Sequence, residues 1–255
     1  MQFDIKQEKE FKFIDEGKGE PLLLLHGLFG ALSNYQYILN DFKSNYRVII
    51  PLLPIFELGL LESTVGGLVK FVRRFVEHKQ LDNMIIIGNS LGGHVAQIYC
   101  LENPEKVKAM VLTGSSGLFE RAFGGSFPKR GDYEYIKQRT EYTFYKPETA
   151  TKELVDEVFD IVNNRNKVLR VISTAKSAMR ENLADRLPQI DCPVLLIWGK
   201  EDKITPPFVA EDFHKLIKNS TLVWMEECGH APMMEKPEEF NRLLQNFLDK
   251  TAFQY

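Results

Sequence analysis

A serine flanked by two glycines follows the apolar run at residues 84–87 and opens a helical pattern. The segment reads MIIIGNSLGG, with Gly88 and Gly92 each two positions from Ser90. In G-x-S-x-G the serine occupies a strained turn between a strand and a helix, and the glycines leave room for neighbouring backbone. This context predicts that Ser90 is a nucleophile. The alternative is that Ser90 only caps the helix, although a cap does not require glycine on both sides.

A serine nucleophile needs a base for its proton, and that base needs an anionic partner to fix its tautomer. In enzymes with this turn the chain order is serine, acid, histidine, each at the carboxyl end of a strand. His230 lies in CGHAP just after TLVWME, and Asp202 lies in VLLIWGKEDKITP a few residues past its strand. We therefore predict Ser90, Asp202 and His230 as the catalytic residues.

The other histidines and carboxylates near these motifs are disfavoured by their positions. His94 is four residues past Ser90 on the same helix, so we interpret it as a packed or capping residue. His26, next to Gly27, is more typical of a structural hydrogen-bonding residue than of a base. The remaining candidates lie on helix surfaces, point outward, or precede a strand: His78, His214, Glu201, Asp185 and Asp191.

A developing oxyanion needs backbone N–H donors aimed at it. Leu91 directly follows the nucleophile at a helix N-terminus and supplies one donor. The second is expected from HGLFG, residues 26–30, where glycines make the backbone adaptable. We predict Leu28 for this role, with Phe29 as the alternative; an ordinary tight turn is the remaining interpretation of HGLFG.

Chain length and net charge restrict the number of domains and the kinds of molecule that the protein is expected to bind. The chain of 255 residues fits one large domain or a core with a small insertion. Its 32 basic and 35 acidic residues give a net charge of -3, and no basic block indicates a nucleic-acid interface. The first 13 residues are charged throughout, and the apolar runs are far shorter than the roughly 20 residues of a membrane span. We expect a cytoplasmic protein without a membrane span that acts on a small-molecule acyl or ester substrate.

The cysteines argue against a disulfide framework and against a zinc site. Cys100, Cys192 and Cys228 form an odd, widely spaced set without a C-x-x-C pair. We predict no metal site.

Apolar segments alternate with helical patterns along most of the chain. Residues 3–15 and the glycine turn at 16–20 are typical of a hairpin that leads into a buried strand. Further strands are expected at 47–51, 84–88, 108–114, 192–199 and 221–226, with helices from 65, and at 91–103, 208–217 and 236–249. Near-continuous apolar strands separated by helices predict an α/β fold with a parallel sheet covered on both faces.

The alternation stops after Gly117. Residues 118–188 hold many aromatic residues and helical stretches, but no run typical of a buried strand. We predict an inserted helical cap at 118–188 and a core made of 1–117 and 189–255.

Four motifs together, HGLFG, GNSLGG, WGKEDKITP and CGHAP, resemble those of alpha/beta-hydrolase fold enzymes with a helical cap. The resemblance covers essentially the whole chain. It implies a mostly parallel eight-stranded sheet flanked by helices, the catalytic set named above, an acyl pocket roofed by the cap, and no cofactor. A serine at position 90 speaks against haloalkane dehalogenases, which carry an aspartate there.

The motifs resemble those of two different branches of the family. GNSLGG and GSSGLF resemble the hydrolases that cleave carbon-carbon bonds in ring-fission products. Those enzymes usually carry tryptophan after the catalytic histidine, where this chain has Ala231, and they use a cap arginine, for which Arg165, Arg170 and Arg180 are candidates. The GHAP ending looks more like simple carboxylesterases, including those that demethylate pimeloyl esters on carrier protein. The segment PLLPIFELG, residues 51–59, departs from the DLPGFG pattern of relatives at the rim of the site.

These features favour a serine hydrolase that cleaves a carboxylic ester through an acyl-enzyme. One alternative is carbon-carbon bond hydrolysis of a vinylogous diketone, and another is a non-catalytic ligand-binding protein on the same fold. Acyl transfer and perhydrolysis use the same constellation of residues.

Overall fold

One sheet of eight strands organises the part of the chain that the structure describes. The structure is a computed structural model, and it describes residues 3–29, 32–119 and 129–252. The sheet order is β1-β2-β4-β3-β5-β6-β7-β8. Its strands are β1 (Lys6–Glu8), β2 (Phe11–Glu16), β3 (Pro21–Leu25), β4 (Arg47–Pro51), β5 (Met84–Asn89), β6 (Val107–Thr113), β7 (Val194–Gly199) and β8 (Ser220–Met225).

The sheet is mostly parallel, as predicted. β2 runs antiparallel to β1 and β4, whereas every pairing from β4 through β3, β5, β6 and β7 to β8 is parallel. The hairpin at the N-terminus is therefore confirmed, but β2 adds to the sheet beside β4 and not beside β3, the strand that follows it in sequence. Because parallel strands end at the same edge, the loops after β5, β7 and β8 meet there.

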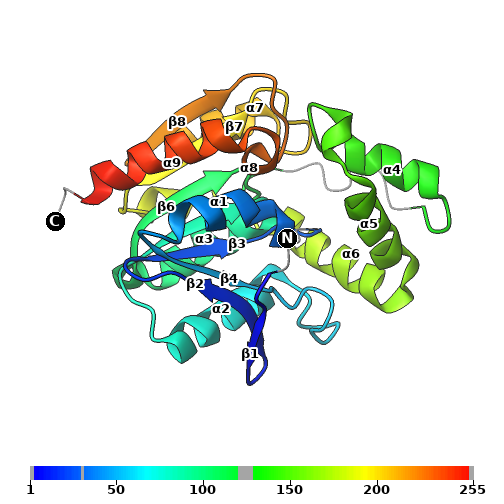
Figure 1. Ribbon diagram of the computed structural model, residues 1–255, viewed down its shortest axis with the longest axis horizontal. Coiled ribbons are helices and arrows are strands. Elements are labelled where there is room, and N and C mark those ends of the chain that lie inside the picture. The colour runs from blue at the N-terminus through cyan, green and yellow to red at the C-terminus, as the bar shows by residue number, and fades with distance from the viewer. Residues whose placement is uncertain (1–2, 30–31, 120–128, 253–255) are drawn as a thin grey trace.

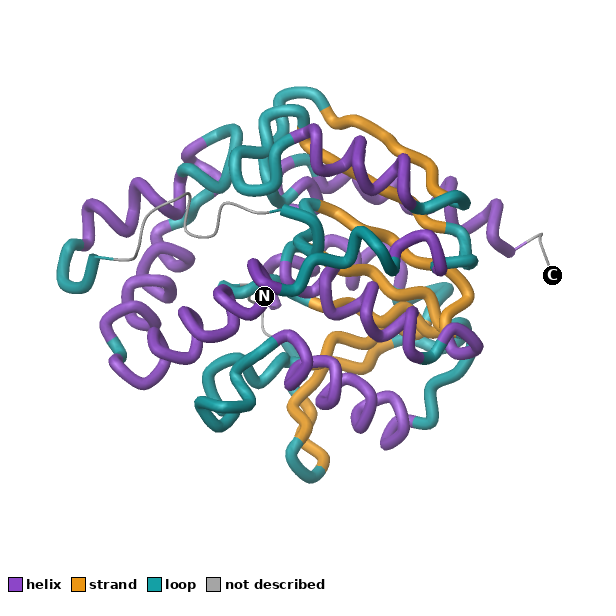
Figure 2. Tube along the Cα trace, turned by 180° about the vertical axis from the view of Figure 1, so that it is seen from behind, coloured by secondary structure: helices purple, strands orange, loops and turns teal. Residues whose placement is uncertain are grey.

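The apolar runs form strands that are buried on both faces. Alternate residues of β3 illustrate this: Leu23 and Leu25 pack in one core cluster, and Leu22 and Leu24 pack in the other. Helices α2 (Val65–Lys79), α3 (Leu91–Glu102) and α7 (Pro207–Leu216) cover the first face. Helices α1 (Gln36–Phe42), α8 (Pro232–Glu235) and α9 (Pro237–Ala252) cover the second, so that the sheet is the middle layer (Figure 2).

In the described part of the segment between β6 and β7, where the helical insertion is predicted, lie three α-helices. They are α4 (Tyr133–Glu141), α5 (Lys152–Asn163) and α6 (Arg165–Arg180), and each begins at a side-chain cap, from Asp132, Thr151 and Asn164 respectively. They lie together at one side of the sheet (Figure 1). The cap boundaries at 118 and 188 stay a prediction, and the aromatics Phe123 and Phe127 lie outside the described residues. We call residues 129–188 the helical insertion.

Candidate active site

The turn between β5 and α3 holds Ser90 in a strained conformation. Ser90 has φ 53° and ψ -120°, a region that non-glycine residues rarely adopt. A side chain at Gly92 would overlap the carbonyl oxygen of Leu25, and a Cβ at Gly88 would lie 2.6 Å from the Cα of Gly93. Both glycines are therefore steric requirements of this turn. Although Ser90 stands at the N-cap position of α3, its hydroxyl makes no capping hydrogen bond, which excludes the cap interpretation.

Asn89 connects the serine turn to the loop that carries His230. Its amide donates to the backbone carbonyl of Thr113, at 3.0 Å, and to the backbone carbonyl of His230, at 3.1 Å. The N–H of Ser90 also donates to Thr113, at 3.1 Å. The ends of β5 and β6 and the loop after β8 are thus fixed to one another by a buried side chain. Asn89 was not anticipated from the sequence; the available signal was a polar residue at the end of a fully apolar strand.

The structure brings the side chains of His230 and Asp202 together. Nδ1 of His230 lies 2.9 Å from Oδ2 of Asp202, and both side chains are buried. Oδ1 of Asp202 accepts from the backbone N–H groups of Ile204 and Thr205, and the Thr205 hydroxyl donates to Oδ2 at 2.7 Å. The carboxylate is therefore held in one orientation by its own loop. Thr205 was not anticipated from the sequence, although it belongs to the same WGKEDKITP motif.

A second carboxylate, Glu235 on α8, fixes the loop around His230 to the helical insertion. Its Oε1 accepts from the N–H groups of Gly229, at 2.9 Å, and Ala231, at 3.4 Å, while its Oε2 accepts from the N–H of Tyr145, at 2.7 Å. The N–H of His230 donates to the carbonyl of Thr143, at 3.0 Å. We call this set of contacts the Glu235 clasp. Burial raises the pKa of Glu235, and its backbone hydrogen bonds act in the opposite direction.

Glu201, expected to point outward, instead supports the same loop. Its Oε2 accepts from the backbone N–H of Cys228 at 2.9 Å, two residues before His230. The expectation was wrong because this part-buried carboxylate has a backbone donor within reach.

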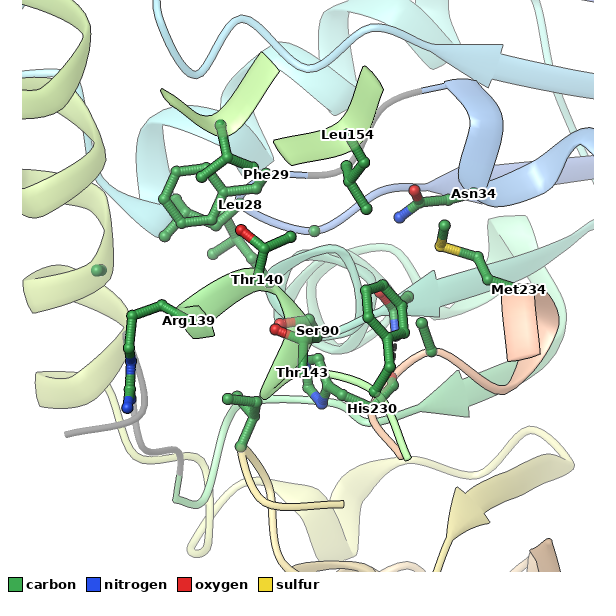
Figure 3. Close-up of a pocket in the computed structure, with 18 of the residues that line it drawn as sticks. Leu28, Phe29, Asn34, Ser90, Arg139, Thr140, Thr143, Leu154, His230 and Met234 are labelled. Atoms are coloured by element: carbon green, nitrogen blue, oxygen red, sulfur yellow. Dashed lines mark hydrogen bonds between the residues drawn. The ribbon is translucent and has the colours of Figure 1, made fainter. Parts of the chain in front are cut away.

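An apolar cavity of about 180 Å³ lies between the core and the helical insertion. Ser90 and His230 both line it (Figure 3). The core contributes Gly27, Leu28, Phe29, Asn34, Asn89, Leu91, Ile204, Ala231 and Met234. The insertion contributes Tyr135, Ile136, Arg139, Thr140, Thr143, Phe144, Leu154, Val158, Val162, Ala175 and Ala178. Helices α4, α5 and α6 therefore supply most of the wall opposite the serine.

Leu28 and Leu91, predicted as the oxyanion donors, both line this cavity. Leu91 is the first residue of α3, where a helix leaves its N–H groups without internal partners. Within the described residues, neither amide donates to another group. Phe29 lines the cavity as well, whereas Gly30 of the HGLFG motif lies outside the described residues.

Two of the other histidines are buried and engaged away from the cavity. His26 accepts at Nε2 from the N–H of Leu53, at 2.9 Å, so its Nδ1 carries the proton and donates to the carbonyl of Gly27. This confirms the interpretation of His26 as a structural residue. His94 is fully buried on α3, as expected for a packed residue, and burial lowers its pKa to about 4.

Among the described residues, the arginine that lines the cavity is Arg139 on α4, whose guanidinium lies over the ring of Tyr142. It lies at the opposite end of the view from Met234, with Ser90 between them (Figure 3). The three arginines suggested by the sequence, Arg165, Arg170 and Arg180, are not among the lining residues. All three belong to α6, which contributes Ala175 and Ala178 to the lining, and their role as a cap arginine stays a prediction.

The described residues contain no group of three or more His, Cys, Asp and Glu side chains arranged to hold a metal ion. Among them there is also no helix with the length and hydropathy needed to cross a bilayer. The three cysteines are free.

The chain belongs to the alpha/beta hydrolase family, whose model matches residues 22–243. It is 27% identical over 256 residues to 2-hydroxy-6-oxo-6-phenylhexa-2,4-dienoate hydrolase of Comamonas testosteroni, covering 92% of this chain and 89% of that protein. It is 28% identical to Lipase 1 of Psychrobacter immobilis, covering 87% and 74%.

A solved structure is also similar. The crystal structure of MGS-MChE2, an alpha/beta hydrolase enzyme from the metagenome of lagoon sediments of Mar Chica, Morocco, has a TM-score of 0.81. It is 40% identical and covers 98% of this chain and 99% of that chain. The protein is a hydrolase, and its relatives include proteins named as a lipase and as a dienoate hydrolase.

Proposed function

We propose that the protein hydrolyses a carboxylic ester through an acyl-enzyme formed on Ser90, with His230 as base and Asp202 as its partner. The observation that carries this proposal is the 2.9 Å contact between Nδ1 of His230 and Asp202 at a cavity that Ser90 also lines. A carboxylate at Nδ1 keeps the proton there, so that Nε2 is the atom available to accept a proton.

In the first half of the reaction, Oγ of Ser90 attacks the ester carbonyl while Nε2 of His230 takes its proton. The amides of Leu28 and Leu91 donate to the resulting oxyanion, an arrangement whose individual donors are typically worth about 3 kcal/mol. The tetrahedral intermediate then collapses, the ester C–O bond breaks, and the alcohol leaves with the proton from His230. Asp202 stabilises the imidazolium while it exists.

In the second half, water attacks the acyl carbon and His230 accepts a proton from that water. The second tetrahedral intermediate expels Ser90, which recovers its proton from His230, and the carboxylic acid departs. Every proton taken by the imidazole is returned, so the cycle requires no cofactor.

The cavity supports an acyl group of modest size. An apolar cavity of roughly 150 Å³ holds a molecule as large as benzene, and the cavity here is about 180 Å³. Its wall on the insertion side is largely aliphatic and aromatic. We therefore propose a small-molecule ester with a compact apolar acyl chain as substrate, and a cytoplasmic location stays a prediction of the sequence.

The experiment that tests this function uses the Ser90→Ala variant. The native protein is expected to hydrolyse a short p-nitrophenyl ester and to be labelled covalently by a fluorophosphonate, and the variant is expected to do neither. A folded variant that retains both reactions would refute the role of Ser90.

Arg139 favours a second candidate, carbon-carbon bond hydrolysis of a dienone acid. Arg139 lines the cavity, and its guanidinium lies over the ring of Tyr142. A guanidinium is a group suited to bind a substrate carboxylate. Two relatives are named as hydrolases of such dienoates, in Comamonas testosteroni and Burkholderia cepacia. Ala231, in the place of the tryptophan typical of that branch, favours the ester instead.

Parallel assays of the two substrate classes distinguish the two candidate functions. Ring-fission dienone acids and simple esters of similar size are assayed on the same preparation, together with Arg139→Gln. Carbon-carbon hydrolysis predicts faster turnover of the dienone and a large rise in its KM in the variant. Ester hydrolysis predicts the reverse preference and little change in KM for an uncharged ester.

A further inference from the structure

The outer face of α6 combines basic and apolar side chains in one exposed stripe. The helix carries five basic residues and no acidic one, although the net charge of the whole chain is -3. At spacings of three and four residues, which place side chains on one helical face, it exposes Arg165, Leu169, Lys176, Met179 and Arg180. Leu169 is 44% exposed and Met179 is 60% exposed. Such a basic amphipathic pattern is typical of helices that lie on membrane surfaces.

The loop between β4 and α2 adds two more exposed leucines beside this stripe. Leu60 is 52% exposed and Leu61 is 95% exposed. The loop is attached to α6 because Nε of Arg170 donates to the carbonyl of Leu58 at 2.6 Å. Both views place the loop next to α6 (Figures 1 and 2). We call the stripe together with Leu60 and Leu61 the basic-apolar face.

We propose that the basic-apolar face docks the protein on an anionic lipid surface. The leucines and Met179 would enter the boundary between headgroups and acyl chains, and the arginines would contact lipid phosphates. The loop also carries Glu57 and Glu62. The stripe has three basic residues against these two acidic ones, so the face keeps a small excess of positive charge. A second copy of the same face is a poorer occupant, because a symmetric contact would bring the basic residues of both copies together.

Docking in this orientation would place the cavity close to the lipid. The side of α6 opposite the basic-apolar face contributes Ala175 and Ala178 to the cavity wall. Helix α6 would then lie between the lipid surface and the cavity. The inference does not depend on the catalytic assignment, because binding to lipid can be measured without turnover.

The test is co-sedimentation of the Ser90→Ala protein with lipid vesicles, since this variant is expected to leave the lipid intact. We expect binding to vesicles of phosphatidylcholine mixed with phosphatidylglycerol, weak binding to phosphatidylcholine alone, and release at high salt. Equal binding to both kinds of vesicle, or binding to neither, would overturn the proposal.

Two variants locate the surface. Arg165→Gln combined with Arg180→Gln is expected to reduce partitioning by at least about tenfold, and Leu61→Ser by about tenfold. The matched controls are Lys218→Gln combined with Arg242→Gln, and Tyr37→Ser, all exposed residues outside the face, and these are expected to bind as the parent protein does. Controls that lose binding as strongly as the face variants would refute the location.

Folding and self-association are checked in the same series. Each substitution is also made in the native protein, where hydrolysis of a water-soluble p-nitrophenyl ester is expected to stay unchanged and so reports an intact fold. Sedimentation velocity is expected to give one species at all protein concentrations. A concentration-dependent dimer that Leu61→Ser dissolves would assign the face to contact between two copies and would overturn the proposal.

Discussion

The turn that carries Ser90 and the helical insertion above it form opposite sides of one cavity, but they are held by different kinds of constraint. In the turn, backbone strain and glycines without space for a Cβ define the conformation within a few residues. The insertion begins each helix at a local cap, and polar contacts such as the Glu235 clasp fix it to the core at a few points.

This difference assigns separate tasks to the two regions. Groups that react must be held to within a fraction of an ångström, and the carboxyl ends of adjacent parallel strands provide that precision. The insertion supplies most of the apolar wall opposite Ser90, so we expect its lining side chains to affect which substrate fits. Substitutions in the core should therefore affect kcat or stability, whereas substitutions at the junction should affect catalysis moderately.

The largest effect is expected for Asp202→Asn. Without the carboxylate the imidazole is no longer held in the tautomer that accepts the serine proton, and kcat should fall by about 10⁴-fold. KM for a short ester should change little. The control is Asp185→Asn, at an exposed acid that precedes β7, which should retain full activity. A variant at position 202 with more than about a tenth of native kcat would contradict the role of this residue.

A smaller effect, on the free energy of unfolding, is expected from His94, the buried histidine on α3. Burial lowers the pKa of His94 to about 4, whereas the group titrates near 6.5 when unfolded. Between these values the unfolded chain binds a proton that the folded chain does not, so the free energy of unfolding falls as pH falls. The loss from this group should approach about 3 kcal/mol at pH 4 and should be absent above pH 7.

Urea unfolding from pH 7 to pH 4 measures this contribution. His94→Gln should lose less stability over the range than the native protein by about that amount. His214→Gln, at an exposed histidine, should follow the native curve. Parallel curves for the native protein and His94→Gln would show that the imidazole is protonated in the folded state.

The next largest effect is expected for Gly92→Ala. A Cβ there would overlap the carbonyl oxygen of Leu25, so Gly92→Ala should lower the free energy of unfolding by about 2 kcal/mol and displace the nucleophile. Gly66→Ala on α2 is the control, because its Cβ would meet only Oγ1 of Thr64, at 3.9 Å. That change should stabilise the protein by up to about 1 kcal/mol. Thermal unfolding and ester turnover measure both, and an active, stable Gly92→Ala would show that the turn tolerates a side chain.

The smallest effect is expected where the two regions meet. Glu235→Gln keeps one acceptor oxygen but presents an NH₂ group to an N–H donor, so the Glu235 clasp must open on one side. We expect kcat to fall by about tenfold, with little change in KM for a short ester, because the loop around His230 shifts. Glu238→Gln, at an exposed residue of the first turn of α9, should have native kinetics. An unchanged kcat in Glu235→Gln would show that the contact between Glu235 and the insertion does not contribute to catalysis.

Local patterns predicted most of the fold. The apolar runs at 47–51, 84–88 and 192–199 are strands, and the helices after Ser90 and near 208–217 lie within a residue or two of their expected bounds. The sequence left Arg165, Arg170 and Arg180 as open candidates and did not point to Arg139, the arginine among the lining residues, because sequence spacing does not show which side of a helix faces a cavity. The roles of Asn89 and Glu235 were missed for a related reason, since each depends on the position of another loop, whereas Thr205 donates to Asp202 within the same loop.

The sequence by itself determined the strained serine turn, the alternation of strands and helices, and the identities of the residues proposed to react. These features depend on steric limits and hydrophobic periodicity, and both are properties of short segments of the sequence. The tertiary structure alone decided the contact of Asn89 with His230, 141 positions apart, and of Tyr145 with Glu235, 90 positions apart. Such contacts form only when sheet order and helix packing bring distant backbone groups within hydrogen-bond distance, and no local pattern specifies that distance.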